Sequence, residues 1–538
     1  MISYSLFNKT QNHSLNVYQA VKYCKECGEN GIIFEKGEYH FYPDMAAEEA
    51  VCVSNHDIYG FRRIAFCLSS LNDFCIDGDG SRFIFHGSII PFYINGSKRV
   101  TLKNLTLDYD SDRILLLRVT DVNDGFFDVQ AENETGYKVS NGILNICTGY
   151  GDSGVLNSLM IRTVGDSDEY EKGTDEEFFC MNPSLFVEDK GDKKLRIHNS
   201  TLNVKSGMYL IAAGDNRSLC NIVINKSSDV TLDSLTMYSS YAMGVLAQVS
   251  KNITIDKMTV AAHTGKLYSL AADATHFVNC RGLVKVTNSS FSDQLDDALN
   301  IHGIFTKIED KSEDSVTVRY MHKSAKGIDI YDAGDKIAVL NPRSLIGNRY
   351  YTVKKAEVIN LNYTKLYLCE PTEDIPVGYV VENLTKNCDL IFEGNRVFKN
   401  RARGMLIGTK GKVEIKNNYF HTSGTSVLFE SDGEYWFESG GTKDVKISEN
   451  IFDRCCIGPV HWGQGVIETV SRREDVEGEY YHNFIAVTDN EFIGNTSPVL
   501  IADNIKTLVF KNNKSNRSLI YDIKRCETID TKEKTVKK

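Results

Sequence analysis

A short hydrophobic template recurs along the chain and constrains the fold more than any other feature. An apolar residue, any residue and a second apolar residue are usually followed by a third apolar residue seven positions after the first. The template starts at Val230, Ile253, Val284, Leu390, Val413, Val445, Ile485 and Leu508, and several starts, such as Val230 and Ile253, are 23 residues apart. This period, with β-type alternation and no helical pattern between repeats, is typical of a parallel β-helix.

An asparagine recurs at the sixth position of the later repeats and fixes their register. It is found at Asn395, Asn418, Asn450, Asn490 and Asn513. Asn tolerates the left-handed backbone of a tight turn, and stacked side-chain amides can bond from coil to coil. Because neighbouring coils stack about 4.8 Å apart, residues at the same position of successive coils should be neighbours in space.

Composition and charge limit the partners of the protein. Of the 538 residues, 42% are hydrophobic, which is enough to form an ample core. The sequence contains no apolar segment long enough to span a membrane. The net charge of -11 argues against nucleic acid and anionic lipid, and favours a neutral substrate. The first residues lack the apolar core of a signal peptide, so the default expectation is a cytoplasmic protein. A homodimer is among the assemblies that the sequence leaves open.

The repeats and their interruptions predict six segments. Residues 1–110 would form an N-terminal cap, with an amphipathic helix over residues 14–30, and the first coils; residues 216–304 the central coils; residues 388–520 the C-terminal coils; and residues 521–538 a solvated tail. Residues 111–215 and 305–387 lose the period but alternate strongly, which predicts two inserted antiparallel β-barrels. The expected fold class is all-β.

Three aspartates carry the strongest chemical signal. Asp296 and Asp297 lie twelve and thirteen residues after the repeat start at Val284, and Asp273 lies eleven before it. In a 23-residue coil Asp273 has the same phase as Asp296, provided that the extra residues of this coil bulge before Asp273, at residues 263–268. Carboxylates on neighbouring coils raise at least one pKa, as a general acid requires.

Several other side chains should converge on these aspartates. Arg403 falls thirteen residues after its repeat start and should lie beside Asp297. The candidate substrate-binding residues are His276, His302, Arg403, Glu430, Trp436 and Glu438. Aromatic faces bind the apolar face of sugars, and carboxylates bind the hydroxyls. Each residue also has a structural alternative: aspartates are common at solenoid turns, a tryptophan can pack in a core, and a histidine can serve as a hydrogen-bonded structural residue.

At these residues the chain resembles glycoside hydrolase family 110. The resemblance is carried by ADATHFVNCRG (272–282), DQLDDALNIHG (293–303), residues 403–440 and VKISENIFDRC (445–455). It implies an inverting exo-α-1,3-galactosidase on a right-handed parallel β-helix with inserted barrels. The three aspartates of that family's centre correspond to Asp273, Asp296 and Asp297, and the implied partner is a glycan with terminal α-galactose.

The implied reaction is a single displacement, in which one carboxylic acid protonates the glycosidic oxygen and a carboxylate activates water. The acid and the base should be roughly 6.5–9.5 Å apart. We expect these roles to be split between Asp273 and the Asp296/Asp297 pair. Replacing any one of the three by Asn should lower turnover by about two orders of magnitude and hardly change stability.

This chemistry requires no metal and no organic cofactor. The lone pair Cys24 and Cys27 is read as structural, since no second pair lies nearby. Two other functions remain open. A polygalacturonase or polysaccharide lyase would need calcium-binding acids or a dense Lys/Arg cluster, and a non-catalytic carbohydrate-binding β-helix would lack the carboxylate cluster.

Overall fold

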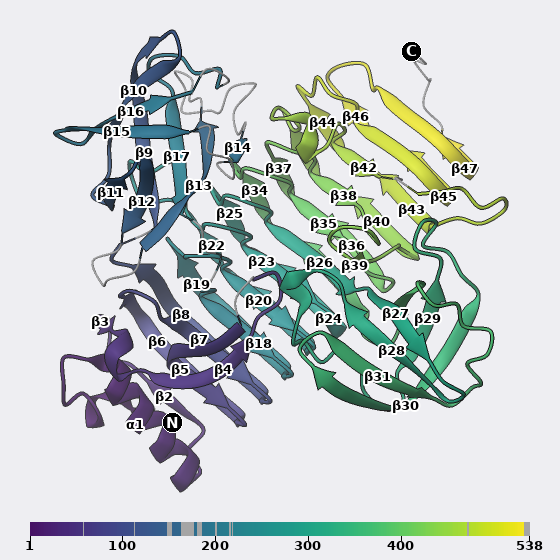
Figure 1. The fold of residues 1–538 in the computed structure, drawn as a ribbon, viewed down its shortest axis with the longest axis horizontal. Coiled ribbons are helices and arrows are strands. Elements are labelled where there is room, and N and C mark those ends of the chain that lie inside the picture. The colour runs from purple at the N-terminus through teal and green to yellow at the C-terminus, as the bar shows by residue number, and fades with distance from the viewer. Residues whose placement is uncertain are drawn as a thin grey trace.

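The computed structural model describes residues 1–531, except for residues 57–58, 112, 148–152, 163–176, 180–184, 200–201, 215–216, 218 and 471–472. Its architecture is a parallel β-helix with two inserted β subdomains and a helix at one end (Figure 1). The fold class predicted from the 23-residue period is therefore confirmed.

Three parallel ladders of strands form the walls of the β-helix. The ladder that carries the site contains β5 (Tyr59–Ser69), β7 (Ile90–Asn95), β18 (Ile222–Asn225), β20 (Val245–Gln248), β23 (Thr275–Val278), β26 (Leu299–Ile304), β35 (Met405–Ile407), β38 (Val427–Phe429), β42 (Ile467–Thr469) and the first parts of β45 (Leu500–Lys511) and β47 (Tyr521–Thr531).

The second ladder holds the first two apolar positions of each repeat. It contains β2 (Gly31–Ile33), β6 (Asn72–Phe85), β8 (Lys98–Tyr109), β19 (Ser228–Met237), β21 (Lys251–Asp256), β24 (Arg281–Thr287), β33 (Cys388–Glu393), β36 (Lys412–Lys416), β40 (Asp444–Ser448), β43 (His482–Thr488) and the second parts of β45 and β47.

The third ladder holds the last apolar position of each repeat. It contains β3 (Glu38–Phe41), the second parts of β6, β8 and β19, and then β22 (Thr259–Val260), β25 (Ser290–Ser292), β34 (Arg396–Phe398), β37 (Tyr419–His421), β41 (Ile451–Asp453), β44 (Glu491–Ile493) and β46 (Lys514–Ser515). Phe420, Phe452 and Phe492 stack here with ring centroids 5.1 Å apart, which aligns successive coils.

The helix α1 (His13–Cys27) covers the open end of the core, as its amphipathic pattern predicted. It begins after Asn12, whose side chain accepts a hydrogen bond from the Ser14 N–H, and it ends at Gly28, whose left-handed φ of 71° closes the last turn. Val17 and Ala20 are fully buried and join the same apolar core as the first coils. Covering this end removes apolar side chains from water that no further coil would bury.

The asparagine ladder forms as the repeats predicted. The Oδ1 atoms of Asn418, Asn450, Asn490 and Asn513 each accept a hydrogen bond from the backbone N–H of the ladder asparagine one coil earlier, at 2.8–3.0 Å. The explanation by turn geometry was wrong in one respect. The left-handed conformation belongs to the preceding residue, such as Asn417, Glu449 or Asp489, with φ of 55–59°. The ladder asparagine itself provides the hydrogen bonds.

The two insertions both leave the β-helix beside the central coils. The second is a closed barrel of β27 (Thr306–Lys311), β28 (Ser315–Tyr320), β29 (Lys336–Leu340), β30 (Arg349–Asn360), β31 (Tyr363–Leu368) and β32 (Val380–Asn383). Its alternate residues, such as Val318, Ile337 and Leu366, form a core of its own.

The first insertion is an antiparallel sheet that curls on itself. It contains β9 (Ile114–Asn123), β10 (Phe126–Ala131), β11 (Gly136–Ser140), β12 (Ile143–Cys147), β13 (Ser153–Arg162), β14 (Glu177–Phe179), β15 (Phe186–Gly191), β16 (Lys194–His198) and β17 (Tyr209–Gly214). The Val187 N–H of the edge strand β15 donates a hydrogen bond to the Gly142 carbonyl, beside the other end of the sheet.

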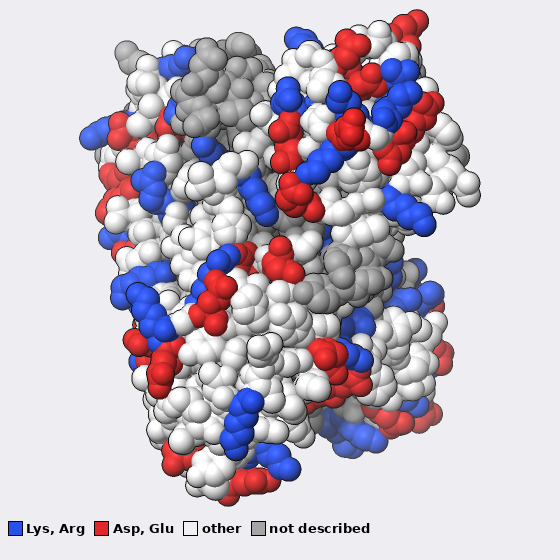
Figure 2. Space-filling model, turned by 90° about the vertical axis from the view of Figure 1, so that its left-hand side faces the viewer, with Lys and Arg blue, Asp and Glu red and all other residues white. Residues whose placement is uncertain are grey.

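The chain end and the surface complete the description. The segment expected as a tail begins with β47, which pairs in parallel with β45, and residues 532–538 lie outside the described residues. On the face shown in Figure 2, acidic and basic side chains are interspersed. Among the described residues, no helix is both long and apolar enough to cross a membrane.

Candidate active site

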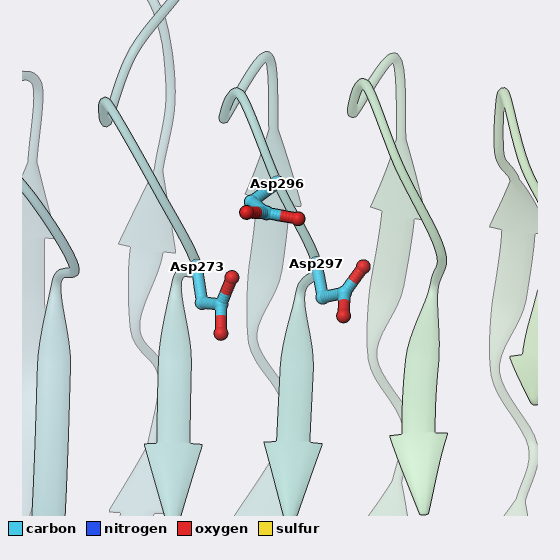
Figure 3. Close-up of side chains that lie close together, drawn as sticks. All are labelled: Asp273, Asp296 and Asp297. Atoms are coloured by element: carbon cyan, nitrogen blue, oxygen red, sulfur yellow. The ribbon is translucent and has the colours of Figure 1, made fainter. Parts of the chain in front are cut away.

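The three aspartates meet where two neighbouring coils enter the first ladder. One residue separates Asp273 from the strand β23, and one residue separates Asp297 from β26. The two side chains therefore lie side by side on neighbouring coils, and Asp296 lies just before Asp297 (Figure 3). One carboxylate oxygen from each residue lies within 4.8 Å of the other two. The side chains are almost enclosed, with exposed fractions of 3%, 6% and 1% in sequence order.

The register differs by one residue from the prediction. Thr275 pairs with Leu299, so Asp273 lies opposite Asp297 and not opposite Asp296. The predicted bulge before Asp273 is present, but the pairing slips once more after it, where Lys251 faces Arg281 and Ile253 faces Val284. That additional residue makes the coil from Asp273 to Asp297 24 residues long, one more than the repeat period.

Two arginines hold two of the carboxylates. The Arg403 backbone N–H donates to Asp297 Oδ1 at 2.9 Å, and its guanidinium donates to Asp297 Oδ2 at 2.8 and 3.2 Å. Arg403 therefore lies beside Asp297, where the repeat phase predicted it. Arg217 donates to Asp296 Oδ2 at 2.6 Å. Asp273 has no arginine in hydrogen-bonding distance among the described residues, and it bonds to a histidine instead.

These surroundings separate the proton affinities of the three carboxyl groups. Burial and the charge of Asp296 raise the pKa of Asp273 well above its ordinary value. Burial alone would raise the pKa of Asp296 as well, but nearby arginine charges, Arg217 first, outweigh it and lower the pKa. Burial, opposed by Arg403 and assisted by the two other aspartates, raises the pKa of Asp297 to about 8. The cluster can thus hold a protonated and an ionised carboxyl group together.

The cluster has the spacing of a cation site but not its charge balance. Three carboxylate oxygens within 4.8 Å could contact one divalent ion. However, Asp296 and Asp297 already accept hydrogen bonds from two cationic side chains. The arginines neutralise the carboxylates as a metal would, so the residues present do not fit a resident cation.

The structure brings two predicted histidines and one glutamate to the cluster. His276 Nδ1 lies 2.5 Å from Asp273 Oδ2, and His276 Nε2 lies 3.0 Å from His302 Nε2. His302 Nε2 is also 3.5 Å from Glu438 Oε1. Gly303 pairs with Ser439 across β26 and β39 (Glu438–Ser439), and this pairing positions the glutamate.

The two remaining predicted residues, Trp436 and Glu430, interact with other residues and not with the aspartates. Trp436 is 48% exposed and packs its ring 4.7 Å from that of His322 in the barrel insertion, so it is not a core residue. Glu430 follows β38, and its charge acts on Arg473. Within the described part of the chain, neither side chain forms a hydrogen bond or ion pair with the three aspartates.

Sequence reasoning missed three residues of this region. Arg217 lies in an irregular segment after the first insertion, where no repeat phase exists. Asn300 is the β26 neighbour of His276, and its buried Oδ1 has no partner within the described residues. Trp462 lies in a short 3-10 helix (Val460–Trp462) with its ring 5.2 Å from the Arg403 guanidinium carbon. An outward polar residue in a strand was the signal that could have identified Asn300.

Comparisons with known proteins show which families and enzymes this chain resembles. Residues 315–380, within the closed barrel, match the family described as GLAA-B beta-barrel domain II. An alpha-1,3-galactosidase A from Shewanella woodyi is 29% identical over 513 residues, covering 94% of this chain and 83% of that protein. An alpha-1,3-galactosidase B from Parabacteroides distasonis is 28% identical over 511 residues, covering 91% and 83%.

Solved structures resemble the chain only distantly. The family 28 exopolygalacturonase of Yersinia enterocolitica has a TM-score of 0.38 and 10% identity, covering 99% of this chain and 78% of that one. The sequence relatives, by contrast, match over most of both chains. They confirm the resemblance that the sequence indicated, and they identify the chain as a glycoside hydrolase related to proteins named alpha-1,3-galactosidases.

Proposed function

We propose that the protein releases galactose from terminal α-1,3-linked galactosides by a single displacement with inversion. The observation that carries this proposal is the unequal environment of three buried carboxyl groups. Raised proton affinity at Asp273 and lowered affinity at Asp296 supply the protonated and the ionised group that glycoside hydrolysis needs. The acid and base roles are divided between Asp273 and the Asp296/Asp297 pair.

Enclosure of the aspartates supports cleavage at a chain end. With at most 6% of any of the three exposed, the site suits one terminal sugar ring better than the middle of a polymer. Half-exposed Trp436 and neighbouring Tyr435, which is 68% exposed, are available to stack against a following sugar.

The stereochemical outcome needs a direct test. The nearest carboxylate oxygens of the three aspartates lie within 4.8 Å of one another. Carboxyl groups in inverting enzymes are usually roughly 6.5–9.5 Å apart, so this shorter spacing by itself favours retention. Inversion is supported by the family resemblance and by the bonding of Asp297. Both of its oxygens accept hydrogen bonds from Arg403, which weakens it as a nucleophile toward the anomeric carbon.

The first experiment is hydrolysis of linear and fucose-branched α-1,3-galactosides with detection of galactose. Polygalacturonate serves as the control substrate, because a polygalacturonase or lyase is the competing enzyme class. Release of galactose supports the proposal; activity on polygalacturonate alone would refute it. Arg217 and Arg403 are already paired with aspartates, which disfavours recognition of a uronate carboxylate.

The second experiment follows the anomeric proton by NMR during early hydrolysis. A single displacement on an α-galactoside yields β-galactose first. Initial appearance of α-galactose would instead establish a double displacement, in agreement with the short carboxylate spacing.

A further inference from the structure

A continuous line of hydrogen bonds leads away from Asp273. It runs from Asp273 Oδ2 to His276 Nδ1 at 2.5 Å and from His276 Nε2 to His302 Nε2 at 3.0 Å. It ends where His302 Nδ1 meets the Gly303 carbonyl oxygen at 2.7 Å. Both imidazoles are buried, with exposed fractions of 1% and 6%, so water cannot substitute for these contacts.

The carbonyl at the end determines which atom donates each hydrogen bond. A carbonyl oxygen only accepts, so His302 Nδ1 carries a hydrogen, and in a neutral imidazole His302 Nε2 is then an acceptor. His276 Nε2 must therefore donate, which leaves His276 Nδ1 as an acceptor. The remaining hydrogen, between His276 Nδ1 and Asp273 Oδ2, belongs to the carboxyl group. Three contacts thus hold three protons when both imidazoles are neutral.

The surrounding charges favour this arrangement. Burial and the neighbouring His302 lower the pKa of His276 to about 3, which keeps this ring neutral. The other ionisable groups that act on Asp273 and the two rings are Asp296, Asp297, Arg217, Arg403, Glu438 and the buried Cys220 thiol. Asp296 and Asp297 bond to arginines, whereas Asp273 bonds to His276, so the tautomer of His276 requires a neutral carboxyl group at Asp273.

We propose that His276 and His302 form a proton relay that connects Asp273 with Glu438 and resets the protonation of Asp273 in each catalytic cycle. This inference rests on the proposed function, and it assigns a positioning and proton-transfer role to two histidines that need not touch the substrate. Glu438 suits the outer end, because its side chain is 17% exposed and lies 3.5 Å from His302 Nε2.

Each transfer conserves protons. When a proton arrives at Asp273 Oδ1, the Oδ2 proton moves to His276 Nδ1, and the His276 Nε2 proton moves to His302 Nε2. His302 then carries two protons and one positive charge, and it releases the Nε2 proton to Glu438 Oε1. In reverse, Glu438 returns its proton to His302 Nε2, the His302 Nε2 proton moves to His276 Nε2, the His276 Nδ1 proton moves to Asp273 Oδ2, and the Oδ1 proton leaves to the reacting oxygen; these steps restore the starting tautomers. The relay therefore operates whether Asp273 donates or accepts a proton during hydrolysis.

The resting state can be tested without substrate. In protein with ¹⁵N-labelled imidazoles, we expect NMR to show His302 protonated only at Nδ1 and His276 only at Nε2, with His276 neutral from pH 5 to 8. His276→Gln and His302→Gln assign the signals. A His276 protonated at Nδ1 over this range would overturn the relay, because Asp273 Oδ2 would then lack the proton with which the transfer begins.

Chemical rescue separates a relay from a structural role. His302→Ala should lower kcat roughly ten- to hundredfold, with KM within about twofold. Added imidazole, which has a donor and an acceptor nitrogen, should restore most of this loss. 1-Methylimidazole fills the same space but cannot donate, and it should not restore activity. Equal rescue by both compounds, or no loss in the variant, would overturn the proposal.

Two further variants complete this test. Glu438→Gln keeps the shape of the outer end but removes its titration, and it should lower kcat with an increased solvent deuterium isotope effect. His263→Ala is the matched control, because His263 pairs with Asp108 in another part of the β-helix and should show neither loss nor rescue. If the wild type hydrolyses no galactoside, the proposed function fails, while the NMR result still decides the resting proton arrangement.

Discussion

Replacing Asp273 by Asn should stabilise the protein increasingly as the pH rises. The Asn amide can donate to His276 Nδ1 as the protonated carboxyl group does, so the variant imitates the neutral state that the site favours. It should also lose at least about two orders of magnitude in turnover, because the amide can neither supply nor accept the catalytic proton.

The magnitude follows from one proton. Burial and the charge of Asp296 raise the pKa of Asp273 in the folded protein, so between the unfolded and folded pKa values the native state holds a proton that the unfolded state has lost. Raising the pH then favours unfolding of the wild type by about 1.4 kcal/mol per pH unit, and Asn removes this term. The stability of the variant relative to the wild type should therefore grow with each pH unit until the pH reaches the folded pKa of Asp273.

Urea unfolding at pH 5, 6 and 7 under reducing conditions, followed by tryptophan fluorescence, measures this difference. Asn300→Ser is the matched control, because it changes the neighbouring strand without removing a titratable group, and its difference from the wild type should not vary with pH. A pH-independent difference for Asp273→Asn would show that Asp273 is ionised in the folded protein, and would refute the reasoning.

Asp297→Asn should behave differently from Asp273→Asn, because above the Asp297 pKa of about 8 it leaves the buried Arg403 charge without its counter-charge; we expect a loss of roughly 3 kcal/mol in unfolding free energy at about pH 9, measured by the same urea unfolding. Arg217→Ala removes the main charge that lowers the pKa of Asp296, so the limb of the pH–rate profile that reports Asp296 should move to higher pH, and an unchanged profile between pH 4 and 9 would contradict this assignment. Asn450→Ala breaks the ladder and leaves the buried Asn418 N–H and Ile415 carbonyl without hydrogen-bond partners, which should lower the unfolding free energy by roughly 3 kcal/mol. A change below about 0.5 kcal/mol would exclude the ladder as a stabilising element.

The stability predicted from sequence for the three aspartate variants is thus revised by the structure. Sequence alone treated the aspartates as equivalent turn residues that Asn could replace. The contacts distinguish them: Asp273 bonds to a neutral histidine, whereas Asp297 balances a buried guanidinium. The repeat phase placed Arg403 beside Asp297, but it gave no hydrogen-bond partner for Asp273 or Asp296.

The repeat pattern by itself determined the β-helix, the asparagine ladder, the two inserted β subdomains and the proximity of Arg403 to Asp297. These features depend on periodicity, and a regular coil places residues of equal phase next to one another whatever the details of packing. The aspartate cluster was predicted on the condition that the extra residues of this coil bulge before Asp273, and the structure has a bulge there.

Only the tertiary structure decided how the side chains of the site pair. One additional residue after Asp273 aligned Asp273 with Asp297. Sequence cannot say whether such a residue is accommodated before or after a given strand, because strand pairing and core packing determine its position. Arg217 and Trp462 come from segments without a repeat phase, so no coil count could place them. A period along the chain fixes neighbours within the solenoid, whereas contacts made by insertions and loops depend on the three-dimensional path of the backbone.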